Sequence, residues 1–341
     1  MEPGTKPIHF TYLSHQDMEA LALSEDEVLQ VVEESLAFQG RGETVIEPRV
    51  HLYPDSKDPS GRYNVLRGVI KPWDITGIKV VATYRQNYEV DLPCEIATLQ
   101  LFNRQTGEPV AFMDATEMTF IRTGAVTAIG AKYLARKNSK ILGHIGARGV
   151  SYWDVRLLDH MYDFDEIRVH SERKESREAF AERLRQDLGK DIIVTDNWQD
   201  CVEGADIVVE ASRLRKPEPL LNSDWIKKGA FVCPFGSQSA CDIRLLDKMD
   251  KVVVDDWGQC RKGGGNELGA LRAHVNADIL TEKTLYAEMG EIAGGVKPGR
   301  QSDDETTLFW HRGIPTSDIA MGYKYLEKAR AQKVGQTLRF F

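Results

Sequence analysis

The stretch that decides the fold is Ile141-Leu142-Gly143-His144-Ile145-Gly146-Ala147-Arg148-Gly149-Val150. Its apolar start predicts a buried strand over 141–146, and its glycines predict a tight turn into a helix that begins at about residue 150. A strand, a glycine turn and a helix N-terminus in this order are typical of dinucleotide phosphate sites, where backbone N–H groups point at the pyrophosphate.

The glycine spacing departs from the usual G-x-G-x-x-G. Gly146 takes the first position, but Arg148 and Ser151 stand at the second and third. Gly149 supplies backbone freedom one position later, and an arginine is electrostatically suited to a phosphate. The motif therefore predicts a dinucleotide site, with a strand–helix turn that binds no nucleotide as the alternative.

Strands and helices alternate after this turn. Short apolar runs are separated by helical patterns such as the charged segment 175–188, and these runs predict strands at 166–170, 191–195, 206–210, 230–234 and 251–255. We expect a helix ahead of each of the last two strands. The alternation predicts right-handed βαβ units and a doubly wound parallel sheet of Rossmann type.

The residues before the turn follow another pattern. Ser24 and Glu27 have the spacing of a capping box, which predicts a helix over 24–39. β-like runs follow, and the clearest lie at 77–84, 96–102 and 109–113, which predicts an antiparallel sheet ahead of a long helix over 116–135. A last helix, over roughly 316–333, lies outside the alternation.

Together these patterns predict an α/β fold with two domains. One is a Rossmann dinucleotide-binding domain over 119–314. The other is an α+β domain with an antiparallel sheet, over 1–118, which the C-terminal segment 315–341 completes. A length of 341 residues is consistent with two domains.

Composition excludes several classes of protein. A formal net charge of −8 argues against a nucleic-acid partner, because phosphate binding needs a basic excess. Five scattered cysteines without a C-x-x-C pair predict reduced thiols, no disulfide framework and no metal site. The polar N-terminus and the lack of an apolar run of ~20 residues predict a cytoplasmic protein without a membrane segment.

The end of the second Rossmann strand bears on the cofactor. An acid for the ribose hydroxyls is usual in NAD sites, but here Ser171 precedes Glu172, Arg173 and Lys174. This favours NADP(H) over NAD(H), although Glu172 weakens the distinction. The residues predicted to bind the cofactor are Thr123, Gly146, Ala147, Arg148, Gly149, Ser171, Arg173, Lys174, Ser212, Gly236 and Ser237.

Three further segments are specific in their order and spacing: Gly77-Ile78-Lys79-Val80-Val81, Ile121-Arg122-Thr123-Gly124-Ala125, and Gly299 to Phe309. With them, the chain from about residue 12 to about 333 resembles the ornithine cyclodeaminase/mu-crystallin family. The resemblance implies a homodimer whose antiparallel sheets join, with substrate held between that domain and the Rossmann domain. The family includes cyclodeaminases, imine reductases, amino-acid dehydrogenases and a crystallin that binds NADPH and thyroid hormone.

The resemblance also implies that Arg49, Lys79 and Arg122 hold a substrate carboxylate. Two guanidiniums can bind a carboxylate in bidentate fashion, and a lysine adds a compact charge that can move a proton. A surface charge is the alternative for each residue taken singly. Lys79 fits that alternative least, because it stands in an apolar strand where a lysine must face water, a partner or a ligand.

Two positions depart from the family pattern. Gln238 stands where the deaminating enzymes carry an aspartate, and a glutamine cannot act as a general base; Asp242 is an outside candidate for that role. His311, beside Arg312, stands where smaller groups are usual. We expect His311 to contact substrate, where it could donate a proton, with a structural histidine as the alternative.

The sequence therefore predicts an NAD(P)-dependent oxidoreductase that interconverts a small amino acid or amine with its imine or oxo acid. Its partner would be a small, carboxylate-bearing amine or imine, and its catalytic residues would be Lys79, Arg122 and Gln238. Two alternatives remain. One is a lyase that eliminates ammonia from ornithine or lysine with recycled NAD, and the other is a binding protein that performs no chemistry.

Overall fold

A computed structural model describes residues 6–55, 61–84, 86–212, 214, 217–236, 240–261 and 270–341 of the chain. The chain divides into two compact units, Met1–Arg122 with Ile314–Phe341, and Thr123–Gly313. The sequence predicted domain boundaries after residues 118 and 314. In the structure, the boundaries between the two units lie inside helix α3 (Thr116–Leu134) and directly before helix α10 (Pro315–Gln332).

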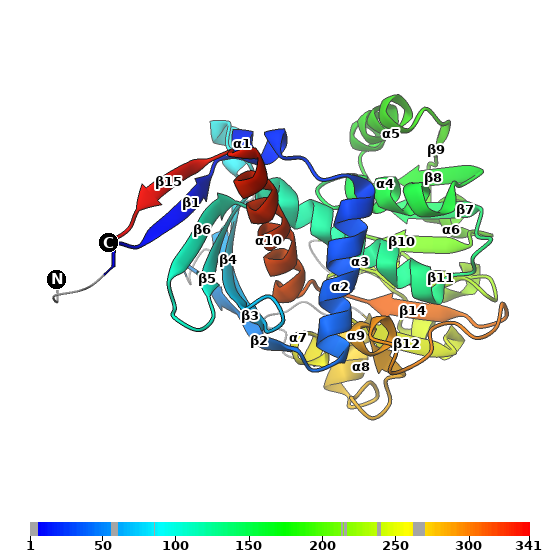
Figure 1. Cartoon of the computed structure of the whole chain (residues 1–341). Helices are drawn as coiled ribbons and strands as arrows, with labels where there is room; N and C mark the ends of the chain where they lie inside the picture. The colour runs from blue at the N-terminus through cyan, green and yellow to red at the C-terminus, as the bar shows by residue number, and fades with distance from the viewer. Residues whose placement is uncertain are drawn as a thin grey trace. The chain divides into compact units, whose positions relative to one another are not determined.

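The described residues of the first unit form a seven-stranded sheet in the order β15-β1-β6-β5-β4-β3-β2 (Figure 1). Neighbouring strands are antiparallel except β1 and β6, which are parallel. The strands are β1 (His9–Leu13), β2 (Thr44–Leu52), β3 (Gly61–Ile70), β4 (Ile75–Tyr84), β5 (Glu95–Asn103), β6 (Pro109–Asp114) and β15 (Gln336–Arg339). The helices are α1 (His15–Ala20), α2 (Glu25–Gly40), α10 and the start of α3.

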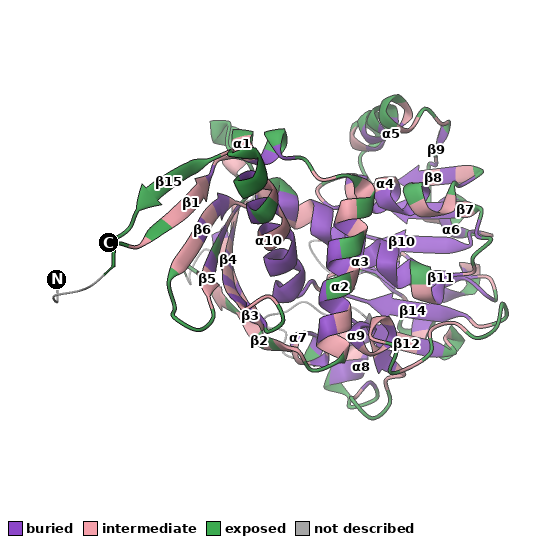
Figure 2. Cartoon of the chain, in the orientation of Figure 1, coloured by how far each residue is buried: buried purple, intermediate pink, exposed green. Residues whose placement is uncertain are grey.

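Helix α10 packs on one face of this sheet, and two glycines permit the close approach. A Cβ on Gly77 of β4 would lie 2.4 Å from Ile319 Cγ1, and one on Gly322 of α10 would lie 2.2 Å from Leu99 Cδ2. The α10 residues that face the sheet are buried, whereas β15 is exposed along its length (Figure 2). The core of the first unit therefore lies between α10 and the sheet, and each fully buried leucine there contributes about 1.5–3 kcal/mol.

The described residues of the second unit form an eight-stranded parallel sheet in the order β13-β12-β14-β11-β10-β7-β8-β9. The strands are β7 (Ile141–Ile145), β8 (Glu166–His170), β9 (Ile192–Val194), β10 (Ile207–Glu210), β11 (Phe231–Pro234), β12 (Lys251–Val254), β13 (Ala287–Glu288) and β14 (Thr307–Trp310). The helices after α3 are α4 (Ser151–Tyr162), α5 (Lys174–Leu188), α6 (Trp198–Val202), α7 (Trp257–Arg261), α8 (Ala270–Asn276) and α9 (Met289–Ala293). Strand order reverses between β7 and β10, as in doubly wound dinucleotide-binding sheets. The predicted fold class is confirmed.

Two details of the second unit differ from the sequence expectation. The helices expected before β11 and β12 are short 3-10 turns, Ser223–Trp225 and Ile243–Lys248, that begin after the capping side chains of Asn222 and Asp242. Neither the two-residue β13 nor strand β14 was predicted, and β14 lies between β11 and β12. Its four residues are all buried, so they show no alternation that could mark them as a strand. Within the described residues, no helix is both long and apolar enough to cross a membrane.

Candidate functional site

Lys79 lies on the buried face of the first unit's sheet. Strand alternation places it on the same side of β4 as Gly77 and Val81, and its cross-strand neighbours are Leu66 and Leu99. The side chain is 1% exposed. A lysine removed from water in this way must be paired or deprotonated.

The partner of Lys79 is Asp318 on α10, a residue that the sequence analysis did not identify. Lys79 Nζ donates to Asp318 Oδ1 at 2.6 Å, and Arg122 Nε forms an ion pair with the same oxygen at 2.7 Å. The exposed fractions of the Asp318 and Arg122 side chains are 0% and 6%. We call Lys79, Arg122 and Asp318 the Asp318 cluster. It brings together two of the three predicted carboxylate-binding cations, far from each other in the sequence.

Local structure fixes the position of Asp318. Pro315 stands in the first turn of α10, where its missing N–H costs nothing, and Asp318 lies in the same turn. A carboxylate there is stabilised by the positive end of the helix dipole. Because Gly77 lets α10 approach β4 closely, this turn lies directly over Lys79.

Arg49, the third predicted cation, lies at a β-bulge in β2. Glu47 pairs with Arg67 and Val50 pairs with Val65, so Pro48 and Arg49 together oppose the single residue Leu66, the cross-strand neighbour of Lys79. A bulge of this kind redirects a side chain. The charge of Arg49 contributes to lowering the pKa of Lys79, which places Arg49 within electrostatic reach of the cluster.

Burial is the main cause of an unusual pKa at Lys79. Burial and then the charge of Arg122 lower it, whereas the charge of Asp318 and its hydrogen bond raise it, and the result is a pKa of about 7. Near neutral pH, Lys79 therefore exists in both its protonated and neutral forms. A group with this property can donate or accept a proton under physiological conditions.

The Asp318 cluster leaves polar atoms unsatisfied. Asp318 Oδ2, Arg122 Nη1 and Thr316 Oγ1 are buried without a hydrogen-bond partner among the described residues. Buried polar groups in folded proteins are nearly always hydrogen-bonded, so such a group calls for an explanation. A guanidinium N–H next to a lysine ammonium is suited to a carboxylate of a ligand.

The glycine turn of the second unit is built to approach a phosphate. Gly146 has φ of +122°, and a Cβ there would lie 2.9 Å from both Ala211 O and Ser151 Oγ. Gly149 also has positive φ, +61°, and no side chain caps the N-terminus of α4. The backbone at this turn can thus come close to a pyrophosphate at the N-terminus of α4.

Arg148 does not fill this turn. Its guanidinium reaches the Ser176 hydroxyl on α5 at 3.5 Å. Ser171 is half-buried at the end of β8, and Arg173 and Lys174 beside it are exposed. Arg148 therefore extends toward the helix that begins with the predicted ribose-phosphate residues.

The other predicted cofactor residues lie in helix α3 and in the segments that follow strands β7, β10 and β11. Thr123 is buried in α3, and Ala147 is half-buried in the glycine turn. Ser212, after β10, donates its N–H to Glu210 Oε1 at 2.8 Å, and Gly236, after β11, has φ of +83°. Ser237 and the predicted catalytic residue Gln238 lie outside the described residues.

Glu210 is a titratable residue that the sequence analysis missed. It ends β10, next to the reversal of strand order, and is 1% exposed. Burial raises its pKa to about 7, against the lowering effect of the Ser212 N–H. Among the described residues, no group of three or more His, Cys, Asp or Glu side chains is arranged to hold a metal ion.

His311 is packed inside the second unit. It is fully buried, and its Nε2 lies 3.0 Å from Thr127 Oγ1. Its ring stacks on Phe309 with centroids 5.2 Å apart, and Phe235 lies against it at 5.1 Å. These contacts place the ring among buried side chains, and substrate contact by His311 stays a prediction.

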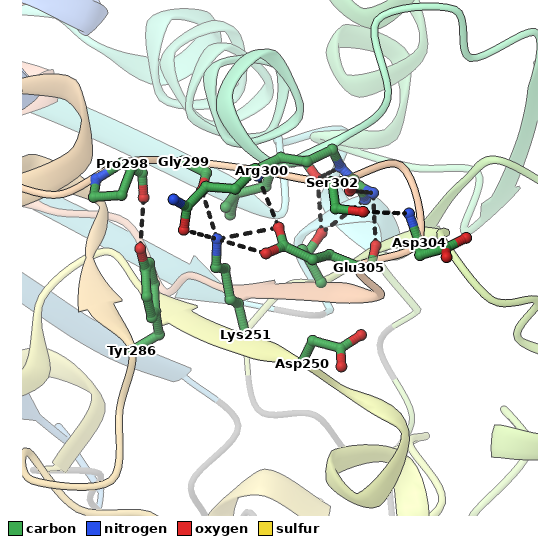
Figure 3. A network of polar contacts seen from close by, with 12 residues as sticks. Asp250, Lys251, Tyr286, Pro298, Gly299, Arg300, Ser302, Asp304 and Glu305 are labelled. Carbon is green, nitrogen blue, oxygen red and sulfur yellow. Dashed lines mark hydrogen bonds and ion pairs between the residues drawn. The ribbon is translucent and has the colours of Figure 1, made fainter.

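The segment from Gly299 to Phe309, which the sequence analysis singled out, forms a network of polar contacts with the rest of the second unit (Figure 3). Lys251 Nζ donates to Gly299 O at 2.7 Å and pairs with Glu305 at 3.0 Å, and it lies over the Tyr286 ring at 4.7 Å. Arg300 donates to backbone carbonyls, including Glu305 O at 2.6 Å. This network holds the loop that leads into β14.

The fold and these features define a class: a Rossmann-type protein with a second α+β unit that carries a buried lysine–arginine–aspartate cluster. Comparison with known proteins identifies the family. The model of the ornithine cyclodeaminase/mu-crystallin family matches residues 11–333, and the chain belongs to this family. The resemblance stated from the sequence is confirmed.

Relatives with assigned names are similar over nearly the whole chain. The alanine dehydrogenase of Archaeoglobus fulgidus is 30% identical over 96% of this chain and 98% of its own length. An archaeal alanine dehydrogenase structure, a dimer with bound NAD, has a TM-score of 0.87 at 28% identity and covers 98% of this chain and 100% of that one. The Thermococcus litoralis Δ1-pyrroline-2-carboxylate reductase, solved with NADH and L-proline, has a TM-score of 0.86 at 28% identity, over 96% and 100% of the two chains. Both structures contain a nicotinamide dinucleotide.

Proposed function

We propose that this protein is an NAD(P)-dependent oxidoreductase that interconverts a small amino acid or amine with its imine or oxo acid. The observation that carries the proposal is the Asp318 cluster, in which a lysine that titrates near neutral pH lies beside an arginine with an unsatisfied N–H. Family membership and the dehydrogenase and reductase relatives support it.

The arginines serve substrate binding in this proposal. Arg122 Nη1 is buried and unsatisfied among the described residues, so a substrate carboxylate would supply the missing acceptor. Arg49, turned by the β-bulge, adds a second guanidinium. A planar guanidinium fixes the orientation of a carboxylate, and with it the position of the adjacent α-carbon.

Lys79 serves proton transfer. In the reductive direction its ammonium donates a proton to the imine nitrogen, C=N becomes C–N, and Lys79 becomes neutral until it regains a proton from solvent. The oxidative direction is the reverse: as C–N becomes C=N, neutral Lys79 takes that proton back from the substrate nitrogen. A bound nicotinamide supplies or accepts the hydride at the carbon, so that imine, reduced cofactor and one proton balance amine and oxidised cofactor.

The test is turnover by the purified chain with NADPH or NADH. Pyruvate with ammonia, and Δ1-pyrroline-2-carboxylate, are the first substrates to supply, and loss of reduced-nicotinamide absorbance is the readout. The proposal expects consumption of cofactor with at least one such substrate. Release of ammonia from ornithine or lysine without net cofactor change would establish the lyase alternative instead.

We also propose that NADP(H) is preferred over NAD(H). Arg148 reaches toward α5, where Arg173 and Lys174 are exposed and no aspartate ends β8. Guanidinium and ammonium groups there suit a 2′-phosphate. Arg173→Ala should raise the KM for NADPH about tenfold and leave that for NADH unchanged, with Arg183→Ala, on α5, as the matched control. Equal effects on both cofactors would refute the preference.

A homodimer formed through the first unit's sheet is the proposed assembly. The face of β4 opposite α10 presents Ile78, Val80 and Ala82, all only half-buried, and the edge strand β2 exposes Val50 and Leu52. Exposed apolar sheet faces commonly mark interfaces. Val80→Glu should shift the sedimentation coefficient to that of a monomer, whereas Ile193→Glu, at an exposed position of β9, should not.

A further inference from the structure

A negative charge lies inside a cluster proposed to bind an anion. Asp318 Oδ1 contacts both Lys79 Nζ and Arg122 Nε, and the aspartate side chain is fully buried. An acid placed there offsets part of the charge that would attract a substrate carboxylate. Its presence therefore requires a function that outweighs this cost.

Lys79 and Arg122 could not both stay charged beside each other without a counter-ion. Burial and Arg122 both favour the neutral form of Lys79, and Arg49 acts in the same direction. Thr119 on α3 adds a neutral oxygen at 3.4 Å, and the cross-strand neighbours Leu66 and Leu99 are apolar. Among the strongest influences on the pKa of Lys79, Asp318 supplies the negative charge.

We propose that Asp318 is a positioning residue: its Oδ1 holds Lys79 Nζ and Arg122 Nε side by side and supplies the negative charge that lets Lys79 bind and release a proton in each turnover. Asp318 acts through these two side chains, since its Oδ1 contacts them. The inference rests on the proposed function for its role in turnover. The geometry of the cluster can be tested without any substrate.

The physical consequence is a shift in the titration of Lys79. An opposite charge within about 4–6 Å moves a pKa by about 1–3 units toward the charged form. Removing the charge of Asp318 without changing its shape should therefore make Lys79 lose its proton at lower pH. Removing the charge of Arg122 should have the opposite effect, because Arg122 destabilises the ammonium.

The chain offers a matched control in Asp206. Its Oδ1 also contacts one arginine and one lysine, Arg136 Nη2 and Lys227 Nζ, both at 2.7 Å. Asp206 belongs to the second unit and precedes β10, whereas Asp318 belongs to the first. Asp206→Asn thus repeats the chemical change of Asp318→Asn in a similar ionic setting that does not include Lys79.

The experiment is a ligand-free NMR titration of the full chain with 13Cε-labelled lysine. The Lys79 resonance is assigned by its loss in Lys79→Arg. We expect a midpoint near 7 in the wild type. The midpoint should be about 1–3 units lower in Asp318→Asn, higher in Arg122→Gln, and unchanged in Asp206→Asn. A folded Asp318→Asn with an unchanged Lys79 midpoint would overturn the proposal.

Measurements of folding and of turnover separate a failure of the Asp318 proposal from a failure of the proposed function. Asp318→Ser, which leaves room for water, is the second variant if Asp318→Asn does not fold. If neither folds while Asp206→Asn does, Asp318 is required for the fold and the proposal is overturned. In folded variants, the pH above which reduction slows should move down with the Lys79 midpoint. A wild type that shows the expected titration but no turnover would refute the proposed function and leave the role of Asp318 in the titration intact.

Discussion

Asp206 and Asp318 each contact one lysine and one arginine within 2.7 Å, but their surroundings differ. At Asp206, the second oxygen accepts the N–H groups of Lys140 and Ile141 at 2.8 and 3.0 Å. Its cationic partners remain partly in water, with side chains 23% and 32% exposed. At Asp318, the second oxygen has no partner among the described residues, and the cations are 1% and 6% exposed.

The pKa values at the two clusters differ in the same way as their surroundings. Burial raises the pKa of Asp206, but the hydrogen bonds from Lys227 and the two backbone amides outweigh it and hold the pKa below its usual value. At the Asp318 cluster, burial dominates and the lysine titrates near pH 7. An aspartate with both oxygens satisfied and partly solvated cations fixes a strand end. One with an unsatisfied oxygen and buried cations has capacity for a ligand. The following predictions test this contrast.

The largest effect is expected from the lysines. Lys79→Met should lower kcat for imine reduction by about 100- to 10,000-fold, because the proton donor is removed. Lys227→Met removes the equivalent lysine from the Asp206 cluster and should leave kcat near the wild-type value. Steady-state kinetics with both variants measure the difference. Comparable losses of kcat in the two variants would show that the two clusters do not differ in function.

The arginines come next. Arg122→Gln should raise the KM for a carboxylate-bearing substrate by roughly 30-fold, since a charged hydrogen bond of about 2 kcal/mol is lost. Arg136→Gln should leave the KM unchanged and lower only the melting temperature. Substrate amides that lack the carboxylate provide a check, because they should not respond to Arg122→Gln.

The pH dependence should have opposite signs in the two directions. Reduction needs Lys79 protonated, so its kcat/KM should fall about tenfold per unit as pH rises above about 7. Oxidation needs Lys79 neutral, so its kcat/KM should rise as pH increases toward and through about 7. Profiles measured in both directions at saturating cofactor would contradict the account if they had the same sign.

The smallest effect is expected from Asp206→Asn. It should lower the free energy of unfolding by about 1–2 kcal/mol, because the Arg136 and Lys227 charges are partly solvated and only the pairing is lost. For a chain of this size that is about 2–4 °C in melting temperature per kcal/mol. Calorimetry gives the change, and kcat and KM serve as the control that should not move.

Much of this structure was accessible from the sequence. The alternation after Ile141 predicted the parallel sheet, because strand and helix periods are local. Lys79 was identified because a lysine flanked by apolar residues in a strand has few alternatives to a partner or ligand. The family resemblance supplied Arg122, and the structure places it on the same aspartate as Lys79.

Asp318 could not be found in this way. An aspartate in a helix usually faces water, and its lysine partner lies 239 positions earlier in the chain. The structure also buries Thr316, Ser317, Ile319 and Ala320, but two of these are polar, so the sequence gives no sign that the turn is buried. Strand β14 was missed for the converse reason, since a fully buried strand shows no alternation.

The most direct test of the account is the proton uptake that accompanies carboxylate binding. Pyrrole-2-carboxylate, a planar acid with no imine to reduce, is titrated calorimetrically into the cofactor-loaded protein at pH 8 in two buffers of different ionisation enthalpy. Neutral Lys79 should gain a proton when the anion arrives, so the account predicts uptake approaching one proton per ligand, abolished in Lys79→Met. Binding without proton uptake in the wild type would contradict it.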